Sequence, residues 1–312
     1  MQICNASSDQ QLQPQHGKVQ IANLSSGDEA GLKSIREAFT ARNPGYDLNY
    51  LKDIREVGPQ AYTQVIFVQE IEGVTDQEGL AQATITDHSG FQKESEAIVG
   101  DILILHPGEK MQADPEVGLL VFQVPEEPGV ELPSFIRPDW DDNITDIPGG
   151  CATDIDAYRR ILLTWKKDVG EYIYHALNSH RVRIRDSFSH YHPQEGGFDE
   201  FYLVQMVEPG ARIITSEQTE IITNPDTVNK LQAKGLMQEY DLEVGDLVYL
   251  PRGVVHRGYD GVLAQVITVP GFIPGSEIGV DHHLRAINER LGLNEDEALP
   301  FNIEASASEV IR

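Results

Sequence analysis

The chain has 312 residues, which is enough for two domains that each bury a core of their own. Its 50 acidic residues outnumber 24 basic ones and give a formal net charge of -26. This balance argues against binding to nucleic acids or to anionic membranes, because phosphate groups are bound by lysine and arginine. The sequence shows no signal peptide and no apolar run of membrane-spanning length, and it has only two cysteines. The expected location is the reducing cytoplasm.

Helices are predicted in only two places. Residues 26–42 begin with a capping pattern at Ser26 to Glu29 and then place apolar side chains at helical spacing. Residues 281–291 repeat the helical spacing near the other end of the chain. Most of the remaining sequence consists of short apolar runs between glycine and proline turns, which is typical of antiparallel β-barrels.

Two segments of the N-terminal half are repeated in the C-terminal half. Residues 64–73 align with residues 200–210, and residues 99–111 align with residues 244–256. Such a long repeat period indicates two copies of one domain rather than a solenoid, whose repeats are shorter.

The segment between the two copies is rich in proline and acidic residues, and it is predicted to be an irregular connection. This gives an N-terminal domain at residues 1–124, a linker at residues 125–153 and a C-terminal domain at residues 154–312.

The C-terminal copy contains a candidate metal site. His190 and His192 are two positions apart, so in a strand both side chains lie on one face and can bind one ion. Glu200 stands at the start of an apolar strand that follows a glycine-containing loop, and His256 follows a second apolar strand and a tight turn. Three imidazoles and one carboxylate favour a divalent first-row metal such as iron, manganese, nickel, zinc or copper.

These residues resemble the two sequence motifs of the cupin superfamily. The family pattern is His-x-His followed by Glu, and later a Gly, a Pro-x-Gly turn and a His. The second motif matches at Gly245, Pro251, Gly253 and His256. The first motif differs in its longer spacing from the histidine pair to the glutamate and in lacking the preceding glycine. Glu195 lies nearer to the usual spacing, whereas Glu200 alone is followed at once by an apolar strand, as the family's glutamate is.

The resemblance implies an all-β fold of two cupin-type jelly-roll barrels with a few peripheral helices. In the N-terminal copy, Gln64 stands where Glu200 does and Met111 stands where His256 does, and no histidine pair precedes Gln64. We therefore expect a degenerate N-terminal barrel and one metal ion per chain. Cupins commonly pack their barrels face to face, which implies a homodimer.

Strand alternation predicts what surrounds the metal. Without a bulge, Phe188 shares the inward face with the histidine pair, while Tyr202 and Val204 share the face of Glu200. These three side chains are expected to form the floor of a mostly apolar pocket for a small organic substrate, with Tyr202 as the candidate catalytic residue.

Cupins catalyse several reactions, so the motifs alone do not define one. The leading hypothesis is an iron-dependent oxygenase or dioxygenase that acts on a small organic molecule. The alternatives are an isomerase of a sugar or uronic acid and a protein that binds a metal or ligand without turnover.

Overall fold

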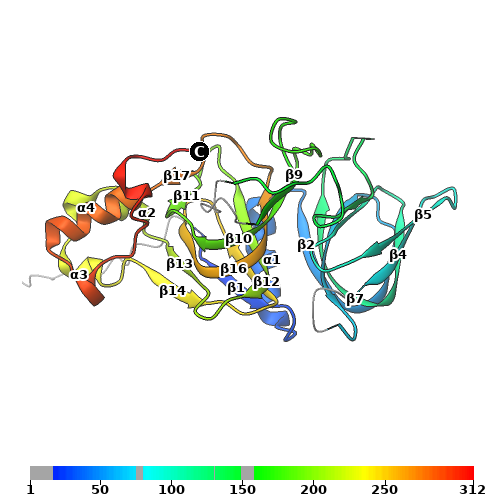
Figure 1. Cartoon of the computed structure of the whole chain (residues 1–312), viewed down its shortest axis with the longest axis horizontal. Helices are drawn as coiled ribbons and strands as arrows, with labels where there is room; N and C mark the ends of the chain where they lie inside the picture. Colours follow the sequence, from blue (N-terminus) through cyan, green and yellow to red (C-terminus); the bar gives the residue numbers. More distant parts are fainter. Residues whose placement is uncertain (1–16, 75–79, 130, 149–157) are drawn as a thin grey trace, which may run out of the picture.

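The computed structural model describes residues 17–74, 80–129, 131–148 and 158–312. These residues form two antiparallel β-sheets, one for each half of the chain, with helices at the periphery (Figure 1). The predicted all-β class, with two antiparallel barrels and a few peripheral helices, is confirmed. No helix among the described residues is both long and apolar enough to cross a membrane. Cys4 and Cys151, on which the predicted reducing environment depends, lie outside the described residues.

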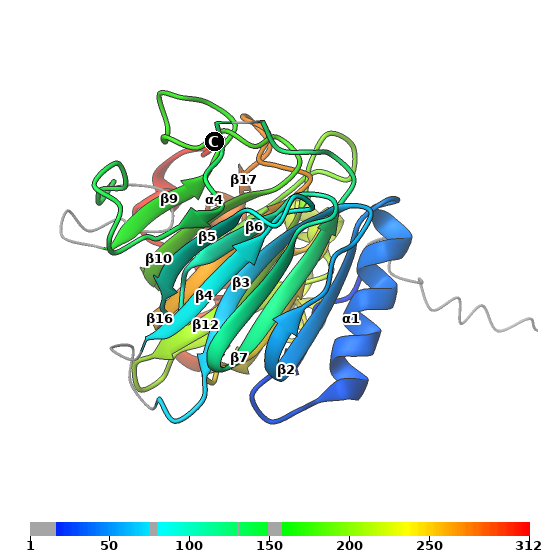
Figure 2. The same ribbon diagram turned by 90° about the vertical axis from the view of Figure 1, so that its right-hand side faces the viewer.

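The N-terminal sheet encloses an apolar interior that includes Ile66, Leu119 and Met111. Its order is β5-β4-β7-β3-β6-β8, and β2 also pairs with β7. Figure 2 shows these strands running side by side, with α1 along the edge next to β2. The strands are β2 (Asp47–Val57), β3 (Thr63–Ile71), β4 (Ala81–Thr86), β5 (Gln92–Ala97), β6 (Ile102–Leu105), β7 (Lys110–Val124) and β8 (Phe135–Ile136).

The C-terminal sheet is built around the long central strand β16 (Val255–Val269), which pairs with β10, β11, β12 and β13. The other strands are β1 (Gln20–Asn23), β9 (Arg159–Leu163), β10 (Asn178–Asp186), β11 (His190–Tyr191), β12 (Asp199–Val207), β13 (Arg212–Ser216), β14 (Gln238–Asp241), β15 (Asp246–Leu250) and β17 (Ile278–Gly279). β1 falls within the range predicted for the N-terminal domain, yet it pairs with β15 and so extends the C-terminal sheet.

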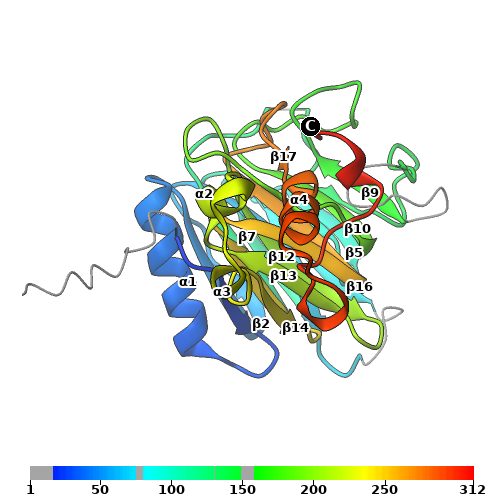
Figure 3. The same cartoon turned by 90° about the vertical axis from the view of Figure 1, so that its left-hand side faces the viewer.

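The two predicted helices are present as α1 (Glu29–Arg42) and α4 (Asp281–Leu291). The side chain of Asp28 caps α1 by accepting a hydrogen bond from the amide of Gly31. α4 lies with two short helices at one end of the molecule (Figure 3). The shorter elements are α2 (Thr219–Ile222), α3 (Lys230–Ala233), η1 (Pro225–Thr227), η2 (Glu295–Glu297) and η3 (Ala305–Ala307).

The halves share an apolar core, which we call the interdomain core. Successive residues of β12 face opposite sides of the sheet. Phe201 packs into this core, whereas Tyr202 packs inside the C-terminal barrel. Phe201 lies 5.3 Å from Phe122 of the N-terminal sheet and 5.1 Å from Phe39 of α1, measured between ring centroids. Both contacts are edge-to-face, the arrangement that aromatic rings favour. Residues 201–204 of β12 are all apolar because the strand is buried on both faces there.

Equivalent strands pair in the same register in the two halves of the chain. Gln64 of β3 pairs with Leu105 of β6, just as Glu200 of β12 pairs with Leu250 of β15. In both halves, a glycine with positive φ precedes the second of these strands. The Gly100 amide donates to Val68 at 2.9 Å, and the Gly245 amide donates to Val204 at 3.0 Å.

Candidate metal centre

Three histidines meet inside the C-terminal barrel. His190 lies directly opposite His256 in the pairing of β11 with β16, and His192 follows β11 by one residue. One ring nitrogen from each histidine lies within 4.8 Å of the others, and each residue is at most 1% exposed. Among the described residues, this is the one cluster of three or more histidine, cysteine or acidic donors close enough to hold a metal ion.

The histidine rings are oriented with their Nε2 atoms available for an ion. The Nδ1 of His190 lies 3.0 Å from the Phe188 carbonyl oxygen, and the Nδ1 of His256 lies 3.2 Å from the Val254 carbonyl oxygen. A proton on Nδ1 leaves the lone pair of Nε2 for a metal. The Nε2 atoms of all three histidines are buried without a hydrogen-bond partner. Buried polar atoms are rarely left in this state, so the cluster fits a metal ion.

Glu200 brings a carboxylate to the same place. Its Oε1 lies 3.3 Å from the Nε2 of His256, and its Oε2 lies 3.8 Å from the Nε2 of His192. The residue is only 3% exposed, and its Oε1 has no hydrogen-bond partner. Glu195, the alternative from the sequence, is exposed in the preceding turn. The structure therefore places Glu200 with the histidines, although its role as a ligand stays a prediction.

The environment of His190 and His192 keeps these two imidazoles neutral. Burial lowers the pKa of His190 well below its usual value, and the nearby His256 lowers it further. Burial is also the main cause of the low pKa of His192, with smaller contributions from His256 and His190. Neutral imidazole is the form that binds metals, so the site is prepared for an ion without first losing protons.

Neighbouring groups hold the ligand residues in place. Phe188 stacks on His190 with ring centroids 4.3 Å apart, and Phe198 packs on His192 at 3.9 Å. Asp199 precedes Glu200 in β12, so its side chain faces the opposite side of the strand. It accepts hydrogen bonds from the Tyr249 hydroxyl at 2.8 Å and from the Arg252 backbone amide at 2.9 Å. Asp199 thereby fixes the turn that leads into β16 and His256.

A cavity of about 310 Å³ opens beside Glu200. Side chains from β9, β10 and the segment after β16 line it. They combine apolar groups, including Trp165 and Phe272, with charged groups, namely Arg159, Glu277 and Arg312. Sequence analysis missed these charged residues because they lie outside both cupin motifs and far apart in the chain.

The predicted pocket floor is different from the observed cavity wall. Among the described residues, Phe188, Tyr202 and Val204 are not part of the lining. β10 ends at Asp186 and residues 187–189 lie outside any strand, so the alternation assumed from the sequence does not extend to Phe188. Tyr202 lies inside the barrel with its ring centroid 6.4 Å from that of His256, and its catalytic role remains a prediction.

The N-terminal copy has apolar or neutral side chains at the equivalent positions. Gln64 is 4% exposed and Met111 is 1% exposed, so both are packed into the barrel. Neither side chain offers the carboxylate or imidazole found at the corresponding position of the C-terminal copy.

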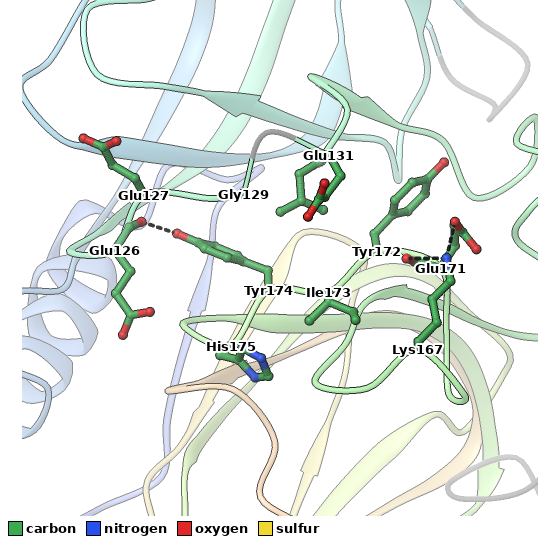
Figure 4. Close-up of a pocket in the computed structure, with 11 residues that line it drawn as sticks. Glu126, Glu127, Gly129, Glu131, Lys167, Glu171, Tyr172, Ile173, Tyr174 and His175 are labelled. Atoms are coloured by element: carbon green, nitrogen blue, oxygen red, sulfur yellow. Dashed lines mark hydrogen bonds and ion pairs between the residues drawn. The ribbon is translucent and has the colours of Figure 1, made fainter.

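A larger cavity, of about 530 Å³, lies near the connection between the halves (Figure 4). Its wall includes four glutamates, one of which, Glu171, forms an ion pair with Lys167. The hydroxyl of Tyr174 donates to the Glu126 carbonyl oxygen at 2.6 Å (Figure 4). Neither the three clustered histidines nor Glu200 lines this cavity.

The two barrels and the buried cluster in one of them define the class of protein: an all-β protein with two barrels, of which the C-terminal one carries three histidines that could hold a metal ion. No protein-family model matches the sequence, and a search of curated proteins finds no match.

Solved structures similar to this chain include oxalate decarboxylases. One, from Lactobacillus farciminis in complex with formate, shows 14% identity and a TM-score of 0.46, with 83% of this chain and 85% of that chain covered. Another, from Bacillus subtilis and studied for its Mn(II) centres, shows 13% identity and a TM-score of 0.48, with coverage of 90% and 81%. A third, studied for its substrate-binding mode, shows 14% identity and a TM-score of 0.45, with coverage of 81% and 74%.

Proposed function

We propose that this chain is a metal-dependent enzyme that acts on a small organic substrate, with His190, His192, Glu200 and His256 holding one divalent transition metal. The position of Glu200 carries the proposal, because this residue belongs both to the histidine cluster and to the wall of the 310 Å³ cavity. A molecule in the cavity is therefore next to the metal ligands. Small-molecule sites are typically concave and largely apolar with a few polar groups, as this cavity is.

The donor set supports the choice of metal. Three imidazoles and one carboxylate suit iron, and also manganese, nickel, zinc or copper. When bound, such an ion would act as a Lewis acid and would keep coordination positions for reactants. The protein's own contribution is to hold the four ligands, to keep His190 and His192 neutral and to cover these two rings with Phe188 and Phe198.

We favour an oxygenase that uses dioxygen and holds iron. The apolar part of the cavity, formed by Ile161, Leu163 and Trp165, supports this reaction. A dry site protects reactive species from side reactions. Tyr202 is a further candidate for a direct role, as its ring lies inside the barrel near His256.

An isomerase of a sugar or uronic acid is the second candidate, and Glu277 is the observation in its favour. The pKa of this cavity residue is raised to about 7, mainly by burial and also by the neighbouring Glu200, while Arg312 opposes the shift. A carboxyl group that exchanges a proton near neutral pH suits the general acid–base catalysis that an isomerase requires.

Metal analysis combined with an oxygen electrode distinguishes the candidates. An oxygenase will contain iron and consume dioxygen when a panel of small organic molecules is added, and Glu200→Gln will lower both metal content and oxygen consumption. Substrate conversion at an undiminished rate without oxygen would instead support the isomerase. A metal that is retained with no conversion of any compound, with or without oxygen, would contradict both enzymes.

A further inference from the structure

Two arginines line the cavity beside the metal centre in a strongly acidic protein. The whole chain has 50 acidic and 24 basic residues. Nevertheless, Arg159 and Arg312 both line this one cavity, and its acidic residues are Glu200 and Glu277. Under the proposed function, Glu200 binds the metal. The two arginines and the metal then outweigh Glu277, so the cavity attracts an anion.

Arg312 is held at the cavity wall by backbone pairing. Its amide donates to the Glu277 carbonyl oxygen at 3.0 Å, and its carbonyl oxygen accepts from the Glu277 amide at 3.0 Å. Its guanidinium carbon lies 4.7 Å from the ring centroid of Phe188, which stacks on His190. The positive charge of Arg312 is therefore fixed close to the metal ligands.

Several polar side-chain atoms in the cavity wall are buried without a hydrogen-bond partner. They include the hydroxyls of Ser179 and Thr268, two residues that are 2% and 4% exposed, and the Nε2 of His180. Thr268 of β16 lies directly opposite Glu200 of β12, so it borders the metal site. Buried polar atoms are normally hydrogen-bonded. Three such atoms in one cavity wall point to a bound molecule that carries oxygen atoms.

The remaining wall is apolar and includes a pair of aromatic rings. Trp165 stacks on Phe272 with ring centroids 4.2 Å apart and an interplanar angle of 29°. Ile161 and Leu163, alternate residues of β9, extend this apolar surface from the strand that also carries Arg159. Charged, hydrogen-bonding and apolar groups thus share one cavity.

We propose that the substrate is a carboxylate with a ring-sized apolar body. The carboxylate binds to Arg159 and Arg312, and the apolar body packs against Trp165 and Phe272. Guanidinium groups recognise carboxylates with high geometric specificity, and a cavity of about 310 Å³ has room for more than a carboxylate alone. This inference rests on the proposed function and names the substrate class of the same site.

Intrinsic fluorescence can test the inference, because the chain has only two tryptophans. In the metal-loaded Trp140→Phe protein, the signal comes from Trp165 alone. We expect saturable quenching by 3-phenylpropionate, with at least tenfold weaker binding of 3-phenylpropionamide, which lacks the charge, and of acetate, which lacks the apolar body. Equal binding of the amide or of acetate would overturn the proposal. Tighter binding of phenyl phosphate than of 3-phenylpropionate would overturn the assignment to carboxylates.

Substitutions in the same background identify the arginines responsible. Arg159→Gln and Arg312→Gln should each weaken 3-phenylpropionate binding tenfold or more, and Arg159→Lys should recover part of the loss. Arg185→Gln is the matched control, because Arg185 is on β10 with its side chain 56% exposed. Melting temperature and metal content will show whether each variant is folded. A folded, metal-loaded double variant of Arg159 and Arg312 that binds 3-phenylpropionate normally would contradict the proposal.

The binding assay is independent of turnover. Carboxylate binding without oxygen consumption or conversion of any substrate would refute the proposed function and leave the substrate class standing. Oxygen consumption with neutral compounds, in a protein that binds no carboxylate, would refute the substrate class and leave the oxygenase standing.

Discussion

The exchange of Glu200 for glutamine tests the assignment of the fourth ligand. Glutamine has nearly the same shape as glutamate but no charge, so Glu200→Gln leaves the packing between β15 and β16 largely unchanged. In the wild type, the carboxylate oxygens lie 3.3 Å and 3.8 Å from the Nε2 atoms of His256 and His192. Changes in residues that only support a ligand typically cost 10- to 100-fold in metal affinity. Loss of a ligand charge should cost at least that much, or about 1.4–2.7 kcal/mol.

Metal titrations monitored by calorimetry, with iron under anaerobic conditions and with manganese, would measure this loss. Glu195→Gln is the matched control, because it removes the same charge from an exposed turn residue. We expect the affinity of Glu195→Gln to stay within twofold of the wild type. A larger loss in Glu195→Gln than in Glu200→Gln would refute the assignment. Negligible losses in both variants would leave a site of three histidines.

Three further predictions concern the barrel interior, pH and the interdomain core. Tyr202→Phe should retain the metal and lower turnover if the hydroxyl takes part in the reaction; unchanged turnover would exclude that role. Burial lowers the pKa of His180 to about 3, whereas the unfolded residue has the usual value of 6.5. Unfolding free energy of the metal-free protein should therefore be unaffected by this residue above pH 6.5. It should fall by up to about 1.4 kcal/mol for each pH unit below 6.5. The unfolding free energy is measured by denaturant titration at each pH, and a pH dependence of His180→Gln equal to that of the wild type would contradict this cause. Phe201→Ala should lower the unfolding free energy by about 3–5 kcal/mol, measured by urea denaturation, and a loss below 1 kcal/mol would argue against the interdomain core as a major source of stability.

The parts of the structure that could be predicted from sequence are those with a local pattern. His190, His192 and His256 stand in short motifs with defined spacing, and α4 has a helical repeat with the bounds that the structure shows. The segment of residues 200–210 aligns with residues 64–73 of the N-terminal half, and the strand pairings agree with that alignment.

The missed features depend on contacts between residues far apart in the chain. The pairing of β1 with β15 joins segments from opposite halves, and nothing in a four-residue strand specifies such a distant partner. Arg159 and Arg312 become neighbours of one cavity only after the barrel has formed. The end of β10 at Asp186 also leaves no clear signal in the sequence, so the alternation assumed up to Phe188 could not be checked from the sequence.

Metal stoichiometry is the most direct test of the central claim, that one barrel binds a metal and the other does not. Elemental analysis of the purified protein should give one transition metal ion per chain, and His256→Ala, with its fold verified by circular dichroism, should give none. The equivalent N-terminal substitution, Met111→Ala, should keep the full metal content. A value near two in the wild type, or full occupancy in His256→Ala, would contradict the account.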